Sequence, residues 1–486
     1  MPDPQGPAPR NRQLTPEHLR HFLLRHPRSP AYWVAYSGGL DSHALLHLAA
    51  GLAQLEPRHC IRAIHVHHGL HPEADAWAEH CESVCEELGI DLSIIRVDAK
   101  PSRGESPEES ARIARYRALQ DRLGHHDCVL LAQHRDDQAE TLLLQLFRGA
   151  GVEGLAAMPA HAELKPGYLA RPLLDFSRDQ LRDYAVANGL RWIEDDSNRD
   201  ETFDRNFLRQ RILPRLRNRW PGLPGSLARS AAHCAEAARH LENRGDTLLR
   251  GVVLDPGANT LDILSLSRLD RQDQKLALRR WITRSGFRRP ASRILERILD
   301  EALSAATDRN PVVGWKEAEV RRYRHALYLM RPLPPLPKTL LSPNSEAVAS
   351  RLAWPAGRTG ITLPHGNGDL RIRRIAGTTN SPGIAPDAWT GGQVEIRYRL
   401  GGEKIRLPGR NGSHEVRKLY QESGIPPWVR ERVPLIYIDQ RLAAVGNYWY
   451  AADFQATAAD PWRIVLEWKV PWDSVVRENP KRSIGE

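Results

Sequence analysis

The chain has 486 residues, enough for about three domains of ~100–200 residues each, and its excess of ten positive charges favours a polyanionic partner such as nucleic acid. An ordinary basic protein is the alternative as long as the charge is not shown to cluster. Five scattered cysteines, an N-terminus with Pro and Arg in place of an apolar signal, and the lack of any apolar run of ~18 residues lead us to expect a cytoplasmic protein without a membrane span.

Short β-branched runs alternate with longer helical patterns from residue 32 to about residue 193. This alternation predicts an α/β fold with a doubly wound parallel sheet, whose ligands bind at the carboxyl ends of the strands. The expected strands are Tyr32–Tyr36, Ile61–Val66, Leu92–Val97 and Cys128–Ala132, and the expected helices are Ser42–Leu52, Glu73–Leu88, Glu108–Leu123 and Asp137–Phe147.

The rest of the chain divides at proline-rich and arginine-rich segments. Residues 226–303 have an all-helical pattern, short β-like segments follow to residue 330, and residues 331–337 predict a semi-rigid proline spacer. Alternation after residue 370 predicts a small α+β domain. We therefore expect a catalytic domain over 1–220, a helical domain over 221–331, a linker and poorly assigned segment over 332–390, and a C-terminal α+β domain over 391–486; the family resemblance given below implies that the second and the last bind tRNA or substrate.

A Ser-Gly-Gly-Leu-Asp-Ser turn follows the first expected strand. Adjacent glycines let the backbone approach an anion, and the turn opens onto a helix N-terminus that favours negative charge. Asp41 repels phosphate unless a cation stands between them, so we expect a bound Mg²⁺. The turn lacks a Walker A lysine, which predicts cleavage of ATP between the α and β phosphates; a simple structural turn is the alternative. The candidate nucleotide-binding residues here are Ser37, Gly38, Gly39, Leu40, Asp41 and Ser42.

A second polar cluster, Gln133 to Thr141, follows the fourth expected strand and should therefore lie at the same sheet edge. Asp137 is our choice over Asp136 for a metal site shared with Asp41, because hard cations prefer several oxygens. A capping box between Asp137 and Glu140 is a compatible alternative. His134 is a candidate catalytic residue, with a plain hydrogen-bonded structural histidine as the alternative.

Four histidines crowd into residues 65–71, with Cys81 and Cys85 downstream. Zinc is disfavoured because the spacing lacks the close pairing of a finger motif. We instead expect His67 and Gly69 to lie beside the adenine and ribose of the nucleotide.

Three further segments carry candidate substrate-binding residues. An expected helix presents Glu109 and Arg112, which a simple salt pair also explains. A glycine-rich loop begins at Arg148, and an arginine stripe at 205, 209 and 215 suits phosphate contact, with a charged helix surface as the competitor. The candidates are Glu109, Arg112, Glu140, Arg148 and Arg205.

Taken in order, the motifs resemble those of the tRNA(Ile)-lysidine synthetase family. They are Ser-Gly-Gly-Leu-Asp-Ser, His-His-Gly-Leu, Glu-Ser-Ala-Arg, His-Arg-Asp-Asp-Gln-x-Glu-Thr, Arg-Gly-x-Gly-x-x-Gly-Leu, and Asp-x-Ser-Asn before Arg-Asn. The likeness is strong over about residues 32–214, and the helical middle and residues 401–430 resemble that family's two C-terminal regions. The turn alone fits any N-type ATP pyrophosphatase of the PP-loop family. The chain departs from the family pattern at Gln133 or Arg135, where a second histidine is common, and at His67, where asparagine is common.

The resemblance implies an enzyme that adenylates the wobble cytidine of an isoleucine tRNA with the anticodon CAU. Free lysine then displaces AMP and gives lysidine. The implied cofactors are ATP and Mg²⁺, and the implied catalytic residues are Asp41, Asp137 and His134. The implied partners are tRNA(Ile) and free L-lysine, and a homodimer is left open. The rivals are another tRNA-modifying enzyme of the PP-loop type, such as a thiolase, and a nucleotide-gated RNA-binding protein without catalysis.

Overall fold

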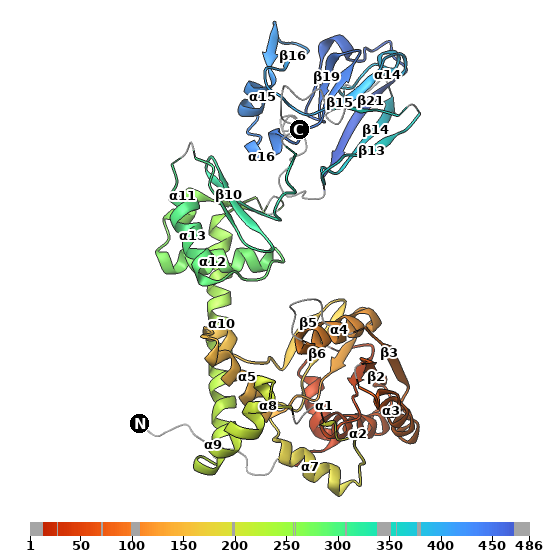
Figure 1. The fold of residues 1–486 in the computed structure, drawn as a ribbon, viewed down its shortest axis with the longest axis vertical. Helices are drawn as coiled ribbons and strands as arrows, with labels where there is room; N and C mark the ends of the chain where they lie inside the picture. The colour runs from red at the N-terminus through yellow and green to blue at the C-terminus, as the bar shows by residue number, and fades with distance from the viewer. Residues whose placement is uncertain are drawn as a thin grey trace. The chain divides into compact units, whose positions relative to one another are not determined.

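The structure is a computed structural model that describes residues 13–26, 28–69, 71–98, 107–196, 200–255, 257, 259–306, 309–337, 351–355, 357–376 and 381–470, with residues 107–109 as backbone only. The chain forms two compact units, residues 1–240 and 241–486, and the boundary falls within the long helix α10 (Figure 1). Among helices built from the described residues, none is long and apolar enough to cross a membrane.

The first unit is built on a six-stranded sheet with the order β3-β2-β1-β4-β6-β5. All neighbouring strands run parallel except β5, which pairs antiparallel with β6 at the edge. The expected doubly wound α/β fold is confirmed. The elements are α1 (Pro16–Leu24), β1 (Tyr32–Ala35), α2 (Leu40–Leu55), β2 (Ile61–His67), α3 (Ala74–Leu88), β3 (Leu92–Arg96), α4 (Pro107–Arg122), β4 (Cys128–Leu130), α5 (Arg135–Phe147), α6 (Val152–Leu155), β5 (His161–Leu164), β6 (Gly167–Ala170), α7 (Arg178–Ala187), α8 (Asp204–Phe207), the π-helical turn η2 (Leu208–Ile212), α9 (Leu213–Arg219) and α10 (Leu223–Val252).

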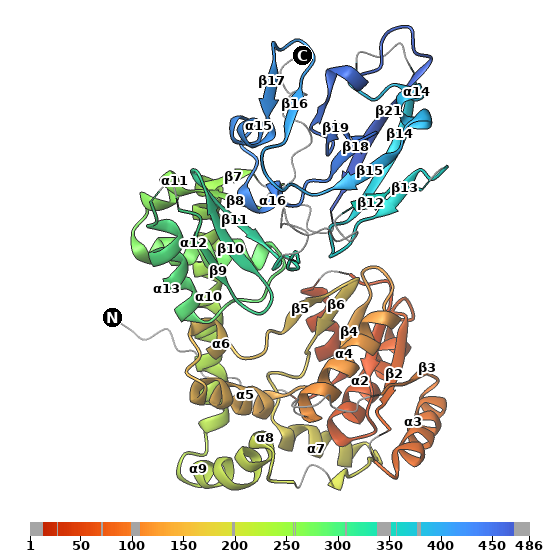
Figure 2. The same cartoon turned by 45° about the horizontal axis from the view of Figure 1, so that its top comes forward.

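Alternating residues of β1 enter two separate hydrophobic cores. Tyr32 and Val34 pack with α1, α2, α3 and α7 on one face, whereas Trp33 packs with α4 on the other. Figure 2 shows α4 against the sheet near β4. Because both faces are covered, the central strands are almost continuously apolar, and the carboxyl ends of the strands are left to carry polar side chains.

The second unit begins with strands as well as helices. The expectation that residues 226–303 are all helical is wrong in one detail, because β7 and β8 lie there and extend a five-stranded sheet, β7-β8-β11-β10-β9. These strands are too short for a visible alternation. The elements up to the spacer are β7 (Val253–Asp255), β8 (Thr260–Asp262), α11 (Ile263–Ser267), α12 (Arg271–Arg284), α13 (Ser292–Arg297), the π-helical turn η3 (Ile298–Leu303), β9 (Val312–Gly314), β10 (Glu319–Tyr323) and β11 (Ala326–Met330).

Residues 331–337 form neither helix nor strand, as their prolines predict. The C-terminal region then forms a five-stranded sheet, β12-β15-β18-β19-β20, a three-stranded sheet, β13-β14-β21, and the hairpin β16-β17. The elements are β12 (Arg351–Ala353), β13 (Gly360–Thr362), β14 (Asp369–Ala376), α14 (Pro386–Gly391), β15 (Val394–Arg397), β16 (Lys404–Arg406), β17 (Ser413–Glu415), α15 (Val416–Glu422), α16 (Pro427–Arg430), β18 (Leu435–Ile438), β19 (Arg441–Val445), β20 (Trp449–Tyr450), the 3₁₀ turn η6 (Ala452–Phe454) and β21 (Trp462–Lys469).

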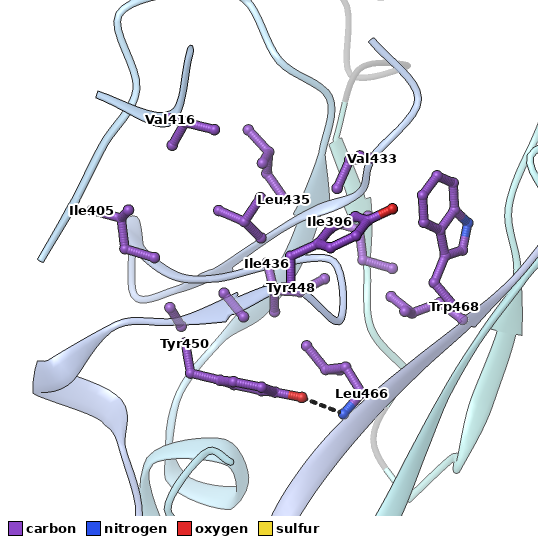
Figure 3. Close-up of a cluster of buried hydrophobic side chains, with 14 of the residues drawn as sticks. Ile396, Ile405, Val416, Val433, Leu435, Ile436, Tyr448, Tyr450, Leu466 and Trp468 are labelled. Carbon is purple, nitrogen blue, oxygen red and sulfur yellow. Dashed lines mark hydrogen bonds between the residues drawn. The ribbon is translucent and has the colours of Figure 1, made fainter. Parts of the chain in front are cut away.

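One hydrophobic core joins these C-terminal sheets. Ile396 and Ile436 come from the five-stranded sheet, and Leu466 and Trp468 come from β21 (Figure 3). The Tyr450 hydroxyl accepts a hydrogen bond of 2.9 Å from the backbone N–H of Leu466, which ties the two sheets together. The described strands of the segment that the sequence left unassigned belong to these sheets, since β12 pairs with β15 and β14 pairs with β21 along its length.

Candidate active site

The turn after β1 depends on a glycine with a left-handed backbone. Gly38 has φ +82°, and a Cβ built on it lies 2.5 Å from Ile193 Cδ1 and 3.3 Å from Cys81 Sγ. Its carbonyl accepts a hydrogen bond of 3.0 Å from the backbone N–H of Ile193. Only glycine fits both the conformation and the space, so the backbone of the turn is held open and close-packed.

Two serine hydroxyls close the turn. Ser42 Oγ accepts from the backbone N–H of Ser37 at 3.2 Å, donates to the carbonyl of Gly39 at 3.0 Å, and lies 3.1 Å from Ser37 Oγ. Gly39 is the N-cap of α2, and no described side chain caps this helix. The first N–H groups of α2 are therefore available to an anion, as the motif predicts.

Asp41, His134 and Asp137 meet at the carboxyl ends of β1 and β4. His134 Nε2 lies 3.5 Å from Asp41 Oδ2 and 3.4 Å from Asp137 Oδ2. His134 Nδ1 accepts the backbone N–H of Asp136 at 3.2 Å, so we assign the ring hydrogen to Nε2, which faces both carboxylates. The structure thus brings together the three side chains that the sequence singled out.

The same contacts begin helix α5 in a way that differs from expectation. The helix begins at Arg135, and its capping box joins His134 to Asp137, not Asp137 to Glu140. The Asp137 carboxylate accepts the backbone N–H of His134 at 3.0 Å. The expected box was wrong by one turn because a histidine, which is an unusual N-cap, caps this helix through its ring.

The Asp41 carboxylate is held in its ionised form. Burial alone raises the pKa of Asp41, but the contact with His134 and the charges of Arg178 and Arg209 outweigh burial and leave the pKa below its usual value. Asp41 Oδ1 is buried without a hydrogen-bond partner among the described residues. This acceptor suits a cation or a donor from a bound molecule.

Glu140 is buried on α5 and is neutralised by two arginines. Arg209, in η2, donates from Nε to Glu140 Oε1 at 2.7 Å and from Nη2 to Oε2 at 2.9 Å, and the same Nη2 donates to Asp137 Oδ1 at 3.0 Å. Arg205 Nε lies 3.1 Å from Glu140 Oε2, and Arg205 Nη2 donates to Thr141 at 2.9 Å. Two of the candidate substrate-binding residues, Glu140 and Arg205, therefore contact each other.

The Asp136 side chain makes structural contacts with α9 and α7. Its carboxylate pairs with Arg217 of α9 and accepts the backbone N–H of Arg178 at 2.8 Å. Asp137, by contrast, lies beside Asp41. The geometry is therefore in keeping with the choice of Asp137 over Asp136.

The other candidates lie apart from this cluster. His67 is buried and lies 3.2 Å from Asp75 and 3.4 Å from Arg96, and no contact found in the described chain joins it to the turn. Gly69 has φ +66°, which allows the chain to turn after β2. Arg112 lies over the Tyr116 ring, and Arg148 is exposed at the end of α5. The side chain of Glu109 lies outside the described residues, as do Leu70, Ser197 and Asn198 of the motifs quoted above.

The described residues offer no cluster of three or more His, Cys, Asp or Glu side chains that could hold a metal ion. In the histidine-rich segment, His65 Nδ1 instead lies 3.0 Å from the carbonyl of Tyr36 and 3.5 Å from Cys81 Sγ. A magnesium ion at Asp41 and Asp137 therefore needs oxygen ligands from a bound nucleotide, which is how proteins usually hold this ion.

Sequence reasoning missed the way in which the arginines act. The sequence predicts Arg209 as part of a stripe for phosphate contact or of a charged helix surface, and it does not single out Arg217, Arg178 or Ile193. The spacing of residues 205 and 209 by four was a usable signal for one shared acidic partner, but a sequence pattern does not reveal which helix lies opposite. Arg209 lies in the π-helical turn η2, and short π-helical turns are often found at functional sites.

Comparison with known proteins extends this picture. Family models described as PP-loop domain, TilS substrate binding domain and TilS substrate C-terminal domain match residues 14–216, 261–328 and 394–468. The chain is 47% identical to the tRNA(Ile)-lysidine synthase of Methylococcus capsulatus over 91% of this chain and 97% of that protein. It is 40% identical to the same-named protein of Coxiella burnetii over 93% and 97%. Among solved structures, a U34-tRNA thiolase from Methanococcus maripaludis is similar with a TM-score of 0.38 and 18% identity, over 45% of this chain and 78% of that one.

Proposed function

The chain belongs to the tRNA(Ile)-lysidine synthase family of ATP-using, tRNA-modifying ligases, and on this premise we propose that it joins free lysine to the wobble cytidine of tRNA(Ile) with the anticodon CAU. The observation that carries the proposal is the position of the uncapped α2 N-terminus beside Asp41, His134 and Asp137. A phosphate site and ionised carboxylates at one sheet edge suit a reaction in which ATP is activated and an amine attacks.

In the first step, the 2-oxygen of the cytidine attacks the α phosphorus of ATP, and the bond to the β-phosphate oxygen breaks to release pyrophosphate. The free N–H groups of α2 and the hydroxyl of Ser37 are the donors that we assign to the phosphates, because the Ser42 hydroxyl donates to the Gly39 carbonyl and holds the turn. Because these donors are held by the close-packed Gly38 turn, little reorganisation is needed when charge develops on the leaving group.

The residues present fit a magnesium ion, since Asp41 offers a buried oxygen without a partner among the described residues and Asp137 lies across His134 from it. Asp41 and Asp137 are the residues that would hold it. When bound, Mg²⁺ neutralises charge on the phosphates and the leaving pyrophosphate.

In the second step, a lysine amine attacks carbon 2 of the activated cytidine, and the bond to the adenylate oxygen breaks to release AMP. The amine must lose a proton to attack. We assign Asp137 as the acceptor, because Glu140 pairs with both Arg205 and Arg209, whereas Asp137 pairs with Arg209 alone and lies 3.4 Å from His134 Nε2. His134 holds the two carboxylates in place through its Nε2–H.

The other parts of the chain would hold the RNA. We assign the catalytic domain to residues 1–220, a tRNA- or substrate-binding domain to 221–331, and a tRNA-binding domain to 391–486. The family models for substrate-binding domains match within the last two regions, and the net charge of +10 supports a polyanionic partner. Formation of a homodimer stays a prediction for sedimentation measurements.

The thiolase alternative is disfavoured by the cysteines. Cys81, Cys85 and Cys128 are buried and free, and burial raises the pKa of each thiol to about 12. A sulfur-transfer enzyme needs an accessible thiolate or a cysteine cluster at its site, whereas the exposed Cys60 precedes β2 and so lies at the sheet edge opposite the acidic cluster. A non-catalytic RNA-binding protein is disfavoured by relatives that are named as synthases along almost their full length.

The test is to incubate the full chain with ATP, Mg²⁺, radiolabelled lysine and a tRNA(Ile) transcript bearing CAU, with the methionine tRNA as the control. We expect label in the isoleucine tRNA alone and one pyrophosphate released per lysine joined. Pyrophosphate release without lysine incorporation would point to a different nucleophile. If neither occurs, the proposed function is wrong.

A further inference from the structure

The peptide group that joins β1 to the turn at residues 37–42 is held at both ends by side chains. The Tyr36 carbonyl lies 3.0 Å from His65 Nδ1, on β2. The N–H of the same peptide group belongs to Ser37 and donates to Ser42 Oγ at 3.2 Å. The N–H of Tyr36 itself continues the parallel pairing of β1 with β2, since it donates to the Ile64 carbonyl at 2.9 Å. Because a peptide group is planar, fixing its C=O and its N–H fixes the direction in which the chain enters the turn.

His65 is the donor to the Tyr36 carbonyl. A carbonyl oxygen only accepts, so the hydrogen lies on His65 Nδ1. The residue is 5% exposed, and burial lowers the pKa of His65, although the hydrogen bond with Tyr36 opposes this effect. The ring is therefore neutral at pH 7, and Nδ1 carries its single N–H hydrogen. Tyr36 is buried as well, so a loss of this donor would leave a buried carbonyl unpaired unless the peptide group rotated toward another donor.

Cys81, on α3, contacts both the His65 ring and the turn. Its Sγ lies 3.5 Å from His65 Nδ1 and 3.3 Å from a Cβ built on Gly38. Burial raises the pKa of the Cys81 thiol to about 12, so the thiol is uncharged at pH 7. Cys81 therefore packs as a small neutral group against the ring and the turn, and this close packing restricts movement of the ring away from the Tyr36 carbonyl.

We propose that His65 is a positioning residue for the turn, because its Nδ1–H holds the Tyr36–Ser37 peptide group in the orientation that leaves the first N–H groups of α2 open to an anion. The inference rests on the proposed function, in which these N–H groups bind the phosphates of ATP. His65 touches neither the phosphates nor the reacting atoms in this assignment, and it acts only through the Tyr36 carbonyl. A displacement of the donors by ~1 Å is enough to lower the rate about 100-fold.

The test replaces His65 by asparagine, glutamine and leucine in the full-length chain. Asparagine carries its amide nitrogen on Cγ, the atom to which Nδ1 is bonded in histidine, whereas the amide of glutamine lies one atom further out and leucine has no donor. In pyrophosphate release with the CAU transcript, we expect kcat/KM for ATP to fall roughly 10- to 100-fold in His65→Leu and His65→Gln. His65→Asn keeps the donor and should stay within about threefold of the wild type. The affinity for tRNA, measured by filter binding, should be unchanged in all three variants.

His47→Leu is the matched control. His47, on α2, is half-buried, and its Nδ1 lies 2.7 Å from the Tyr184 hydroxyl, but no hydrogen bond found in the described chain joins it to the turn. This variant loses a bond of the same kind and should keep the wild-type kcat/KM for ATP. A role of His65 in packing alone predicts a different order of activity, because glutamine and leucine fill the space of the ring better than asparagine does.

Three outcomes would overturn the role of His65. One is a His65→Leu variant with the wild-type kcat/KM for ATP. Another is a His65→Asn variant that is no more active than His65→Gln or that fails to fold, because a donor at the Nδ1 position would then not be what the turn needs. The third is an equal loss of activity in His47→Leu. A wild-type chain that releases no pyrophosphate from ATP would instead refute the proposed function, so the two failures are distinguishable.

Discussion

Replacing Gly38 by alanine should strain the backbone of the phosphate-binding turn and place a Cβ in collision with Ile193. An alanine at φ +82° costs about 1–2 kcal/mol of backbone strain, and its Cβ would lie 2.5 Å from Ile193 Cδ1. Rotation of Ile193 away from its preferred rotamer costs a further ~0.5–1.5 kcal/mol. We expect a loss of about 1.5–3.5 kcal/mol in unfolding free energy if the turn keeps its shape. If the turn moves instead, its N–H groups leave the phosphate and activity falls about 100-fold, as for a displacement of ~1 Å.

Gly89→Ala is the matched control. Gly89, at the end of α3, has φ +66°, and a Cβ built on it meets no atom within 4 Å. This variant has a similar backbone strain without a collision, so it should lose about 1–2 kcal/mol of stability and keep its activity. The double variant Gly38→Ala with Ile193→Ala removes the collision and should recover part of the activity lost by Gly38→Ala alone.

The assays are urea unfolding and pyrophosphate release at varied ATP concentration with the CAU transcript. The reasoning is refuted if Gly38→Ala keeps the wild-type KM for ATP and kcat, or if Gly89→Ala loses as much activity as Gly38→Ala. An unrescued double variant would show that backbone strain, not the contact with Ile193, displaces the turn.

Three other perturbations test the acidic cluster and the buried histidines. Asp41→Asn keeps the shape of the side chain but removes its charge, so the rate of pyrophosphate release should fall at least about 100-fold. The affinity for tRNA, measured by filter binding, should stay within about twofold of the wild type. A normal rate of pyrophosphate release would exclude the role assigned to Asp41. Arg209→Met leaves Glu140 with one arginine and should lower the free energy of unfolding in urea by about 3 kcal/mol. Arg209→Lys keeps the positive charge and should lower it by less. Equal losses in the two variants would mean that compensation of the Glu140 charge is not the cause. His43 is buried on α2, and burial lowers its pKa from 6.5 to about 4. Between pH 6.5 and pH 4 the unfolded chain therefore binds a proton that the folded chain does not. Stability should fall as the pH drops through this range, by at most about 3 kcal/mol from this residue. A His43→Gln variant should have a flatter pH dependence of its urea midpoint over that range, and an unchanged slope would contradict the assignment.

Much of the fold followed from local patterns. The four expected parallel strands each match an observed strand to within two residues at either end, because strands buried on both faces are apolar runs bounded by polar turns. The β5–β6 hairpin was missed, since its two four-residue strands form at the edge of a sheet that the sequence pattern does not reveal. The three-residue strands β7 and β8 were missed for the same reason.

The candidate site likewise has features that local sequence predicts and features that it does not. The glycine turn could be predicted because its chemistry is contained in six consecutive residues, and Asp41, His134 and Asp137 could be placed at one edge because parallel strands present their carboxyl ends together. The cap of α5 was misassigned because the box uses a histidine ring in place of an aspartate.

The partners of Glu140, Asp136 and Gly38 lie 42–155 positions away in the chain, and only the tertiary structure reveals them. Arg209 was visible in the sequence as a positive charge on a helix, but whether it faces RNA or a buried carboxylate depends on which helix packs opposite. Local sequence carries backbone conformation and side-chain chemistry, because these depend on neighbouring residues. The pairing of buried charges depends on desolvation, and desolvation exists only once distant segments have packed together.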